Sequence, residues 1–513
     1  MMVDWTTLGF LGIPAAYLLS AATAGLAGPQ AGWRLVQLGN AAALALALLL
    51  ALAPPPEARW FLHAPMNLVV LVLVTFIGLV VARFSTHYLG GDDGQGRFQC
   101  WLQVALACVA LVVTSNQFLV LLLAWAAISF SLHQLLMFYP QRKRAALAAH
   151  KKFLFARVAE LCLALAGVLL YLESGTLFLD GMLAAYGGDA VRLAPREQLA
   201  ALLIASAAMI KCAQFPMHGW LIQVVEAPTP VSALLHAGIV NLGGYLLLLM
   251  APLMAHAAPA NALLLVVAGL TCVTAALVTM TRVSIKVLLA WSTVAQMGLM
   301  LVECALGQYG LALLHLVAHS CYKAYSFLAS GGQVEAYLRQ RLAPPAPVAR
   351  GAAPAFVVAA AALLGTLGWR GELPADASLW LLFGLMILVL LLERSSTLAR
   401  GALVRFAGLA LLLAAAYLVQ KTLFGALAPP VADPGPLPVL WCCLLFAGLL
   451  GAYWLLRSYP ATPLARRLYR NLFAGFYLDE WSTRVTLALW PARLPQRAAS
   501  KQVITLRKLE ESA

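Results

Sequence analysis

The sequence predicts an all-α integral membrane protein with about 13–15 transmembrane helices, and three observations support this class. Of its 513 residues, 63% are hydrophobic and only 11% are charged, whereas a soluble domain has roughly a quarter of its residues charged. Apolar runs of about 20 residues recur along the chain, and each can cross roughly 30 Å of hydrocarbon. The runs are rich in Leu and Ala without the alternation of barrel strands, so we expect helices.

The predicted spans follow one another from near the N-terminus to residue 456. No basic segment precedes the first apolar run, so we expect no cleavable signal peptide. The fourth span is short for a full crossing, and Pro216 is expected to break the seventh near 211–220. The spans are 8–27, 35–53, 65–82, 101–113, 116–139, 150–172, 199–226, 232–254, 261–281, 284–303, 307–331, 353–369, 377–393, 402–421 and 437–456.

The distribution of Lys and Arg predicts how the chain is oriented. The net charge of +14 would suggest nucleic-acid binding in a soluble protein, but in a membrane protein it fits the positive-inside bias. If the N-terminus is outside, twenty-six Lys and Arg fall on the cytoplasmic side and five on the other. The cytoplasmic set includes a cluster made of Arg142, Lys143, Arg144, Lys151 and Lys152. The opposite side keeps Arg59, Arg192, Arg196, Arg370 and Lys421.

The chain is expected to have two parts, a polytopic membrane domain (1–456) and a basic cytoplasmic tail (457–513). The tail alternates basic residues with large apolar ones and is too polar to span. Amphipathic helices that lie on the cytoplasmic face or dock on a partner fit this pattern, and a plain basic surface tail is the alternative. The apolar residues are Leu464, Leu468, Phe473, Phe476, Tyr477, Trp481 and Trp490.

Motifs of several enzyme classes are missing from the sequence. It has no Gly-rich phosphate loop, serine nucleophile elbow or haem-attachment motif, and its nine cysteines are scattered, mostly in apolar runs. We therefore expect a transporter subunit with no catalytic site of its own.

Ionisable residues inside the spans are candidate functional sites, because each costs several kcal/mol unless it is paired or hydrated. Arg157 and Glu160 lie three apart in the sixth span and can form an ion pair, which could also be purely structural. Lys211 lies in the middle of the seventh span, five residues before Pro216. A broken helix at this depth is tolerated where it lines a cavity, and a buried lysine suits proton uptake and release. Snorkelling of Lys211 to the interface is the alternative.

Further candidates follow the broken span. Pro228 and Pro230 fix a turn, after which His236 lies about one turn into the next helix. His236 could also be a hydrogen-bonded packing residue. Lys286 opens the tenth span, where interface anchoring is the alternative reading.

His315, His319 and Lys323 recur at i, i+4 and i+8 in the eleventh span. They form one stripe roughly 12 Å long on the helix, which is typical of a proton relay because histidine titrates near neutral pH. Two histidines at i and i+4 can also hold zinc. No third ligand is near in sequence, so no metal site is predicted.

Four ordered motifs carry a resemblance to a known family. They are Lys-Cys-Ala-Gln-Phe-Pro from Lys211, Ala-Pro-Thr-Pro-Val-Ser-Ala-Leu-Leu-His from Ala227, Ser-Ile-Lys-Val-Leu-Leu-Ala-Trp from Ser284 and His-Leu-Val-Ala-His-Ser-Cys-Tyr-Lys from His315. Residues 65–340 thus resemble the antiporter-like subunits of respiratory complex I, membrane hydrogenases and Mrp sodium/proton antiporters. Among these, the chain is most similar to the membrane subunits of the two-part DabA–DabB inorganic carbon pumps of bacteria.

The resemblance implies an antiporter-like fold and a hydrated proton path in a bacterial inner membrane. Arg157 and Glu160 would lie on the same axis as this path. The path itself would contain the residues that match the family's motifs, which are Lys211, His236, Lys286, His315, His319 and Lys323. The implied function is proton or cation translocation for uptake of CO₂ or bicarbonate, and the alternative is a subunit of a complex I-type NADH-quinone oxidoreductase or an Mrp antiporter. A peripheral DabA-like partner, similar to carbonic anhydrase, would hold zinc, and this chain would hold no cofactor.

One position departs from the family's pattern. The antiporter-like subunits place a glutamate after a tryptophan in the fifth span, whereas here Ala126 follows Trp125 and the span contains no acid. Lys211 must therefore pair elsewhere, with Glu160 as the candidate, or titrate without a partner. The difference weakens the complex I and Mrp readings more than the carbon-pump reading.

Overall fold

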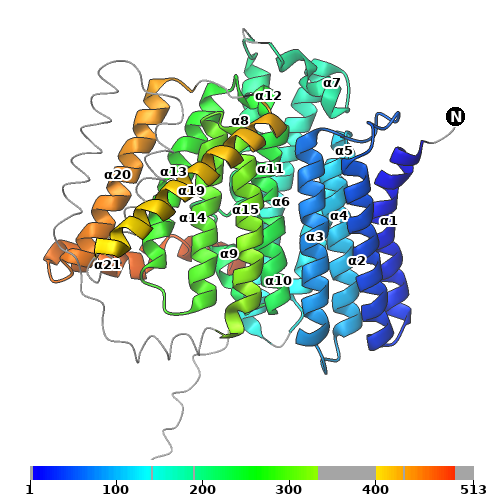
Figure 1. Cartoon of the computed structure of the whole chain (residues 1–513), viewed down its shortest axis with the longest axis horizontal. Coiled ribbons are helices and arrows are strands. Elements are labelled where there is room, and N and C mark those ends of the chain that lie inside the picture. Colours follow the sequence, from blue (N-terminus) through cyan, green and yellow to red (C-terminus); the bar gives the residue numbers. More distant parts are fainter. Residues whose placement is uncertain (1–3, 140–141, 189–190, 333–399, 431–433, 491–513) are drawn as a thin grey trace, which may run out of the picture.

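The computed structural model describes residues 4–139, 142–188, 191–332, 400–430 and 434–490, and in these ranges the chain is a bundle of helices. Figure 1 shows most helices standing side by side, with the N-terminus at the upper end of the bundle. Ten helical segments of the described ranges are long and apolar enough to cross a membrane. The predicted all-α membrane class is confirmed. The predicted spans 353–369 and 377–393 lie outside the described residues.

The first six helices follow the predicted order, with one correction. They are α1 (Trp5–Leu26), α2 (Pro29–Ala51), α3 (Pro65–Tyr88), α4 (Gln95–Thr114), α5 (Phe118–Leu136) and α6 (Lys143–Ser174). The expectation that the fourth span is short was wrong, because α4 has 20 residues. Its polar residues are buried rather than in a loop: Gln103 accepts hydrogen bonds from Ser20 at 3.0 Å and Asn40 at 3.1 Å.

Two cations assigned to the cytoplasmic cluster lie inside the protein instead. Helix α6 begins at Lys143, well before the predicted span, and Lys151 and Lys152 are 0% and 4% exposed. They are buried because the fold supplies partners, a carboxylate of the tail for Lys151 and the Ser129 carbonyl for Lys152.

The predicted break in the seventh span is present. Helix α8 (Pro195–Lys211) ends at Lys211, and regular helix resumes only in α9 (Gly219–Gln223). Pro216 within the gap has no N–H to donate. Polar side chains replace the missing helical bonds: Gln214 donates to the Cys212 carbonyl at 2.7 Å, and the Phe215 N–H donates to Thr271 at 3.1 Å. The irregular backbone is thus satisfied inside the protein, as burial in a membrane requires.

The eighth span is interrupted, although the sequence predicts a continuous helix over 232–254. It comprises α10 (Thr229–Leu234), a π-helical turn (Leu235–Ile239), α11 (Leu242–Leu249) and α12 (Ala251–Met254). A π-helical turn widens the helix locally and often occurs at functional sites. His236 lies within this turn and is fully buried.

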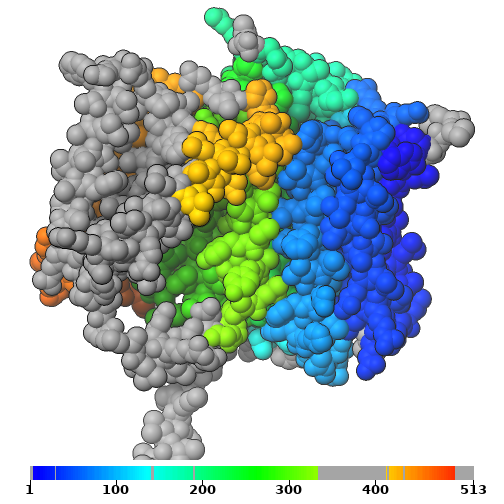
Figure 2. Space-filling model, in the orientation of Figure 1, coloured from blue at the N-terminus to red at the C-terminus, as the bar shows by residue number. Residues whose placement is uncertain are grey.

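The remaining helices surround this broken core. They are α7 (Leu179–Leu183), α13 (Ala258–Thr279), α14 (Ile285–Ala305), α15 (Tyr309–Leu328), α19 (Arg400–Leu427), α20 (Pro436–Ser458), α21 (Pro463–Phe473) and α22 (Glu480–Leu489). Helix α19 runs obliquely across α15, a crossing that is also visible in the space-filling view (Figures 1 and 2). The two backbones meet at Gly310, where a Cβ would lie 2.7 Å from the Cα of Gly425.

The described part of the tail folds back on the bundle. Helix α21 lies at the end opposite to the N-terminus (Figure 1). Arg282, between α13 and α14, donates a hydrogen bond to the Leu472 carbonyl at 2.8 Å. Trp490, beyond α22, stacks on His150 of α6 with ring centroids 3.9 Å apart. Part of the tail therefore belongs to the packed structure of this chain.

Candidate functional site

Arg157 and Glu160 form the ion pair that their spacing predicts. The guanidinium donates to Glu160 at 2.7 Å on the surface of α6. The Arg157 side chain is 41% exposed, whereas that of Glu160 is 11% exposed. Glu160 therefore presents its carboxylate toward the protein interior.

Lys211 lies at the end of α8 and lines a small cavity together with Lys152 of α6. The cavity has a volume of about 20 Å³, which is room for about one water molecule. The Lys211 ammonium lies 4.5 Å from the centroid of the Trp125 ring, a cation–π contact that favours the charge. Ala156 and Ala159 of α6, which lie beside Arg157 and Glu160 in sequence, line the same cavity. The structure thus brings Lys211 near the acid that the sequence offered as its substitute partner.

His236 and Lys323 contact the same turn of α14. The Lys323 ammonium donates to the Leu289 carbonyl at 3.0 Å and to Ser292 at 2.9 Å. The Nδ1 atom of His236 lies 3.1 Å from the Thr293 hydroxyl, which itself donates to the Leu289 carbonyl at 2.9 Å. Polar groups of one helical turn therefore connect the π-helical turn to α15.

His315 has an acidic partner that the sequence analysis did not select. The Nδ1 atom of His315 lies 3.0 Å from a carboxylate oxygen of Glu303, which is buried near the end of α14. The ring of His319 lies one turn further along α15, 6.0 Å from that of His315. Glu303 is an acid within an apolar span, so the rule applied to the other residues would have found it.

Several buried nitrogens in the α14–α15 region have no protein partner among the described residues. They are the Nε2 atoms of His236 and His315 and both ring nitrogens of His319. Buried polar atoms nearly always have a partner, either protein or water. The hydrated path that the resemblance implies would supply water to these nitrogens.

Lys286 lies apart from these residues, near the start of α14. Its ammonium donates to the Thr229 hydroxyl at 2.9 Å, and Thr229 donates to the Tyr88 hydroxyl at 3.3 Å. Thr229 lies between Pro228 and Pro230, the two prolines that precede the π-helical turn. Thr229 thus ties the proline turn to α14 through Lys286 and to α3 through Tyr88.

The predicted residues fall into two sets with the broken core between them. Arg157, Glu160 and Lys211 form one set on α6 and α8, while the other lies on the π-helical turn, α14 and α15. Ile239 lines the Lys211 cavity and also a second cavity of about 20 Å³ that reaches Ser320 of α15. The π-helical turn therefore borders both sets. In the described ranges, no group of three or more His, Cys, Asp or Glu could hold a metal ion.

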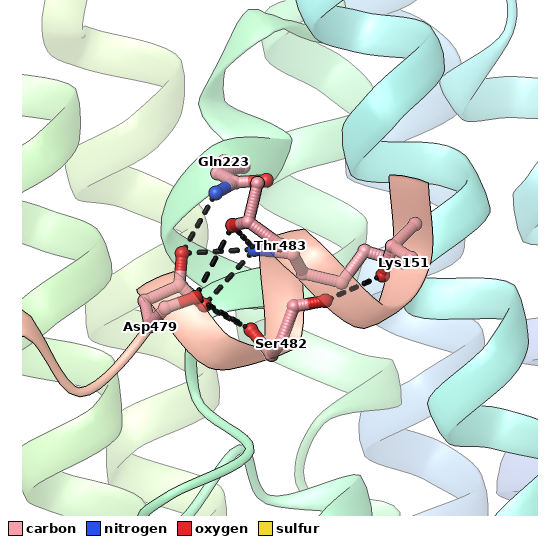
Figure 3. A network of polar contacts seen from close by, with 6 residues as sticks. Lys151, Gln223, Asp479, Ser482 and Thr483 are labelled. Atoms are coloured by element: carbon pink, nitrogen blue, oxygen red, sulfur yellow. Dashed lines mark hydrogen bonds and ion pairs between the residues drawn. The ribbon is translucent and has the colours of Figure 1, made fainter. Parts of the chain in front are cut away.

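The sequence analysis also did not predict a polar network that the tail forms with the bundle. Asp479 accepts hydrogen bonds from Lys151 at 2.8 Å, Gln223 at 2.8 Å and Ser482 at 2.6 Å. Figure 3 shows these side chains and Thr483 converging from α6, α9 and the start of α22. Sequence spacing gives no signal for this contact, because Lys151 and Asp479 lie 328 residues apart.

Comparison with known proteins finds the antiporter-like family that the sequence motifs resemble. Residues 115–342 match the family described as NADH:quinone oxidoreductase/Mrp antiporter, TM, and residues 61–99 match NADH-Ubiquinone oxidoreductase (complex I), chain 5 N-terminus. The chain is 46% identical to the probable inorganic carbon transporter subunit DabB of Hydrogenovibrio crunogenus, over 92% of this chain and 93% of that protein. It is 32% identical to NADH-quinone oxidoreductase subunit L of Escherichia coli, over 52% of this chain and 44% of that protein.

A solved structure shares the fold. A chain of the Mrp complex from Dietzia sp. superposes with a TM-score of 0.59 and 24% sequence identity, over 99% of this chain and 59% of that chain. The described helices thus share their arrangement with a chain of that complex.

Proposed function

Because the chain belongs to the family of inorganic carbon transporter subunits DabB, within the antiporter-like proteins, we propose that it is the ion-translocating membrane subunit of an energy-coupled inorganic carbon pump. Protons pass through it along the buried lysines and histidines, and this flow drives uptake of CO₂ or bicarbonate. The subunit would lie in a bacterial inner membrane with its N-terminus outside and its tail in the cytoplasm.

One observation carries the proposal, the row of buried protonatable side chains on both sides of a broken helix. Lys211, His236, His319 and Lys323 are each at most 8% exposed. Such groups are expensive inside a membrane and are retained where ions or protons move. The unpartnered imidazole nitrogens and the small cavity at Lys211 support access of water to them.

The hydration of CO₂ belongs to a second protein in this proposal. A peripheral DabA-like subunit would hold zinc and convert CO₂ to bicarbonate, while this chain supplies the ion flow that makes the step one-way. The chain would then need no cofactor or catalytic site of its own. The partner's docking surface would be the cytoplasmic end of the bundle.

The first test is Lys211→Met in a bacterium that needs the pump to grow in air, with the partner gene present. We expect bicarbonate uptake to fall by at least about tenfold, because loss of a proton-transferring group typically costs about a hundredfold or more. Lys421→Met, on α19 and outside both sets, is the matched control and is expected to leave uptake unchanged. Normal growth and uptake with Lys211→Met at wild-type protein levels would refute the assigned role.

A subunit of a cation antiporter or redox complex is the second candidate, and the match of residues 115–342 to the NADH:quinone oxidoreductase/Mrp family favours it. Sodium/proton exchange without bicarbonate uptake in vesicles would identify an antiporter. Copurification of redox subunits in place of a zinc protein would identify a redox complex.

A further inference from the structure

A cavity of about 450 Å³ lies beneath the broken helix, between the bundle and the tail. His218, Ile222 and Trp291 line it from the bundle, and Tyr477 and Asp479 line it from the tail. The cavity has room for several water molecules. Its rim is in solvent, because the side chains of Glu480 and Arg484 are 55% and 81% exposed.

Asp479, an acid that lines this cavity, forms an ion pair with the buried Lys151. The Lys151 side chain is 0% exposed, and both oxygens of Asp479 accept from its ammonium, at 2.9 and 2.8 Å. The Asp479 side chain remains 29% exposed. One carboxylate therefore contacts both the aqueous cavity and an ammonium inside the bundle.

Two elements connect this ion pair to the cavity at Lys211. On α6, Lys151 contacts Asp479 and the next residue, Lys152, lines the Lys211 cavity. On α9, Gln223 donates to Asp479 and Trp220 lines the Lys211 cavity. Trp220 and Gln223 are three residues apart, about 4.5 Å along a helix. Helices α6 and α9 thus each contact Asp479 and also line the Lys211 cavity.

His218 is a second protonatable group in the same cavity. It ends the irregular segment before α9 and is 1% exposed, and no described residue offers a partner to its Nδ1 atom. Its ring packs against those of Phe215 and Trp291, with centroids 4.5 and 5.0 Å away. A buried imidazole nitrogen that lines a solvent-filled space requires water as its partner.

The other charged groups of the cavity are engaged elsewhere. Glu480 pairs with Arg484 at 3.4 Å on the rim, and Arg282 donates to the Leu472 carbonyl. Arg282 also lies 5.4 Å from the centroid of the Trp291 ring. Asp479 is therefore the carboxylate of this cavity that contacts an ionisable group of α6, Lys151.

On the premise of the proposed function, the geometry points to this cavity as the cytoplasmic access of the proton path and to Asp479 as the carboxylate that exchanges protons with water there. Protonation of Asp479 removes the counter-charge of Lys151, and this change acts on Lys152 and the Lys211 cavity next to it. The tail between α21 and α22 is then a functional part of the path as well as a packed segment.

A double variant separates this role from a structural one. Asp479→Asn alone leaves the Lys151 charge buried and unpaired, which is destabilising, whereas Asp479→Asn with Lys151→Met removes both charges and is tolerated in many buried pairs. The full chain with its native partner, reconstituted in vesicles with an internal pH dye, reports proton flux. We expect the double variant to fold and to lose flux by about tenfold or more. Glu480→Gln, on the next residue, is the control and is expected to stay within about twofold.

Flux in the double variant within twofold of wild type would overturn the proposal, because a merely structural ion pair is dispensable once both charges are removed. Equal losses in the double variant and in Glu480→Gln would also overturn it. Lys211→Met in the same vesicles separates the two proposals. Loss with Lys211→Met but not with the double variant rejects only the access site, and retention with Lys211→Met rejects the proposed function.

A second measurement does not depend on the ion pair. Val287 lines the cavity, and Val283, in the loop before α14, is 91% exposed and does not line it. We expect a charged, impermeant thiol reagent to block flux in Val287→Cys but not in Val283→Cys or wild type. Full flux after complete labelling of Val287→Cys would contradict access through this cavity.

Discussion

The buried lysines of this protein are held by different kinds of partner. Lys323 donates to a carbonyl and a hydroxyl, Lys152 donates to a carbonyl, and Lys211 lies over an aromatic ring. Lys151 alone among these four has a direct carboxylate partner. Neutral partners satisfy the ammonium hydrogens without fixing the charge, so the charge at Lys211, Lys152 and Lys323 depends on neighbouring ionisable groups and water. That arrangement suits side chains that pass protons along a row.

Glu303 is expected to be required for transport, because it is the acid that faces the histidines of α15. Glu303→Gln keeps the size and hydrogen-bonding capacity of the side chain but removes the charge beside His315. We expect proton flux to fall by about tenfold or more. Glu173→Gln, which removes an exposed partner of Arg196, should leave the flux within about twofold. Equal flux in the two variants would show that Glu303 has only a packing role.

At the residue level, the sequence indicated four of the buried bases but few of their partners, and it wrongly placed Lys151 and Lys152 in a cytoplasmic cluster. Lys211, His236, His319 and Lys323 could be predicted because a charged or imidazole side chain in an apolar run has no route to water through its own helix. Lys286 and the Arg157–Glu160 pair could be placed by the same reasoning. Asp479 could not, because its partner lies in another element and only folding brings the two together.

At the scale of elements, the close approach of α9 and the start of α22 holds the tail against the bundle. A Cβ on Gly219 would lie 1.4 Å from a carboxylate oxygen of Asp479. Glycine is therefore required here by space and not by an unusual φ angle. The break in the seventh span contributes to the same contact, because α9 starts at Gly219 after the irregular segment.

Gly219→Ala is expected to detach the tail from the bundle. A loss of about 1.4 kcal/mol of docking free energy raises the population of the open tail about tenfold, and proteolysis of an opening segment follows that population. Trypsin cleavage after Arg484 should therefore accelerate by about tenfold in the purified protein. Gly448→Ala on α20, where nothing lies within 4 Å of the added Cβ, is the control. Identical cleavage rates in the two variants would contradict the contact.

At the scale of the whole molecule, the two ends of the bundle differ in charge and in structure. The N-terminus, α7 and the pair of Arg59 with Asp180 at 3.0 Å lie at one end, and the tail helix α21 lies at the other (Figure 1). The basic tail lies at the second of these ends, and the positive-inside bias predicts that this end is cytoplasmic. A proton path from the cavity beneath α9 to the residues of α15 would run between these ends.

The orientation can be measured with single cysteines at the two ends. Arg196 and Arg484 have side chains that are 65% and 81% exposed. In intact cells, an impermeant thiol reagent should label Arg196→Cys, whereas Arg484→Cys should be labelled only after permeabilisation. A chain with its native cysteines replaced serves as background, and the reverse labelling pattern would invert the predicted topology.

The sequence alone determined the class, most spans, the break at Pro216 and the burial of Lys211, His236, His319 and Lys323. These features depend on local composition, because each helix must satisfy its own backbone and cover about 20 residues with apolar side chains. The tertiary structure decided the pairs: Glu303 with His315 across two helices, Glu160 near Lys211, and Lys151 with Asp479 across 328 residues. It also decided the π-helical turn at His236 and the cavity beneath α9. Charge pairing and cavities depend on distances between elements, and these distances exist only once the helices pack.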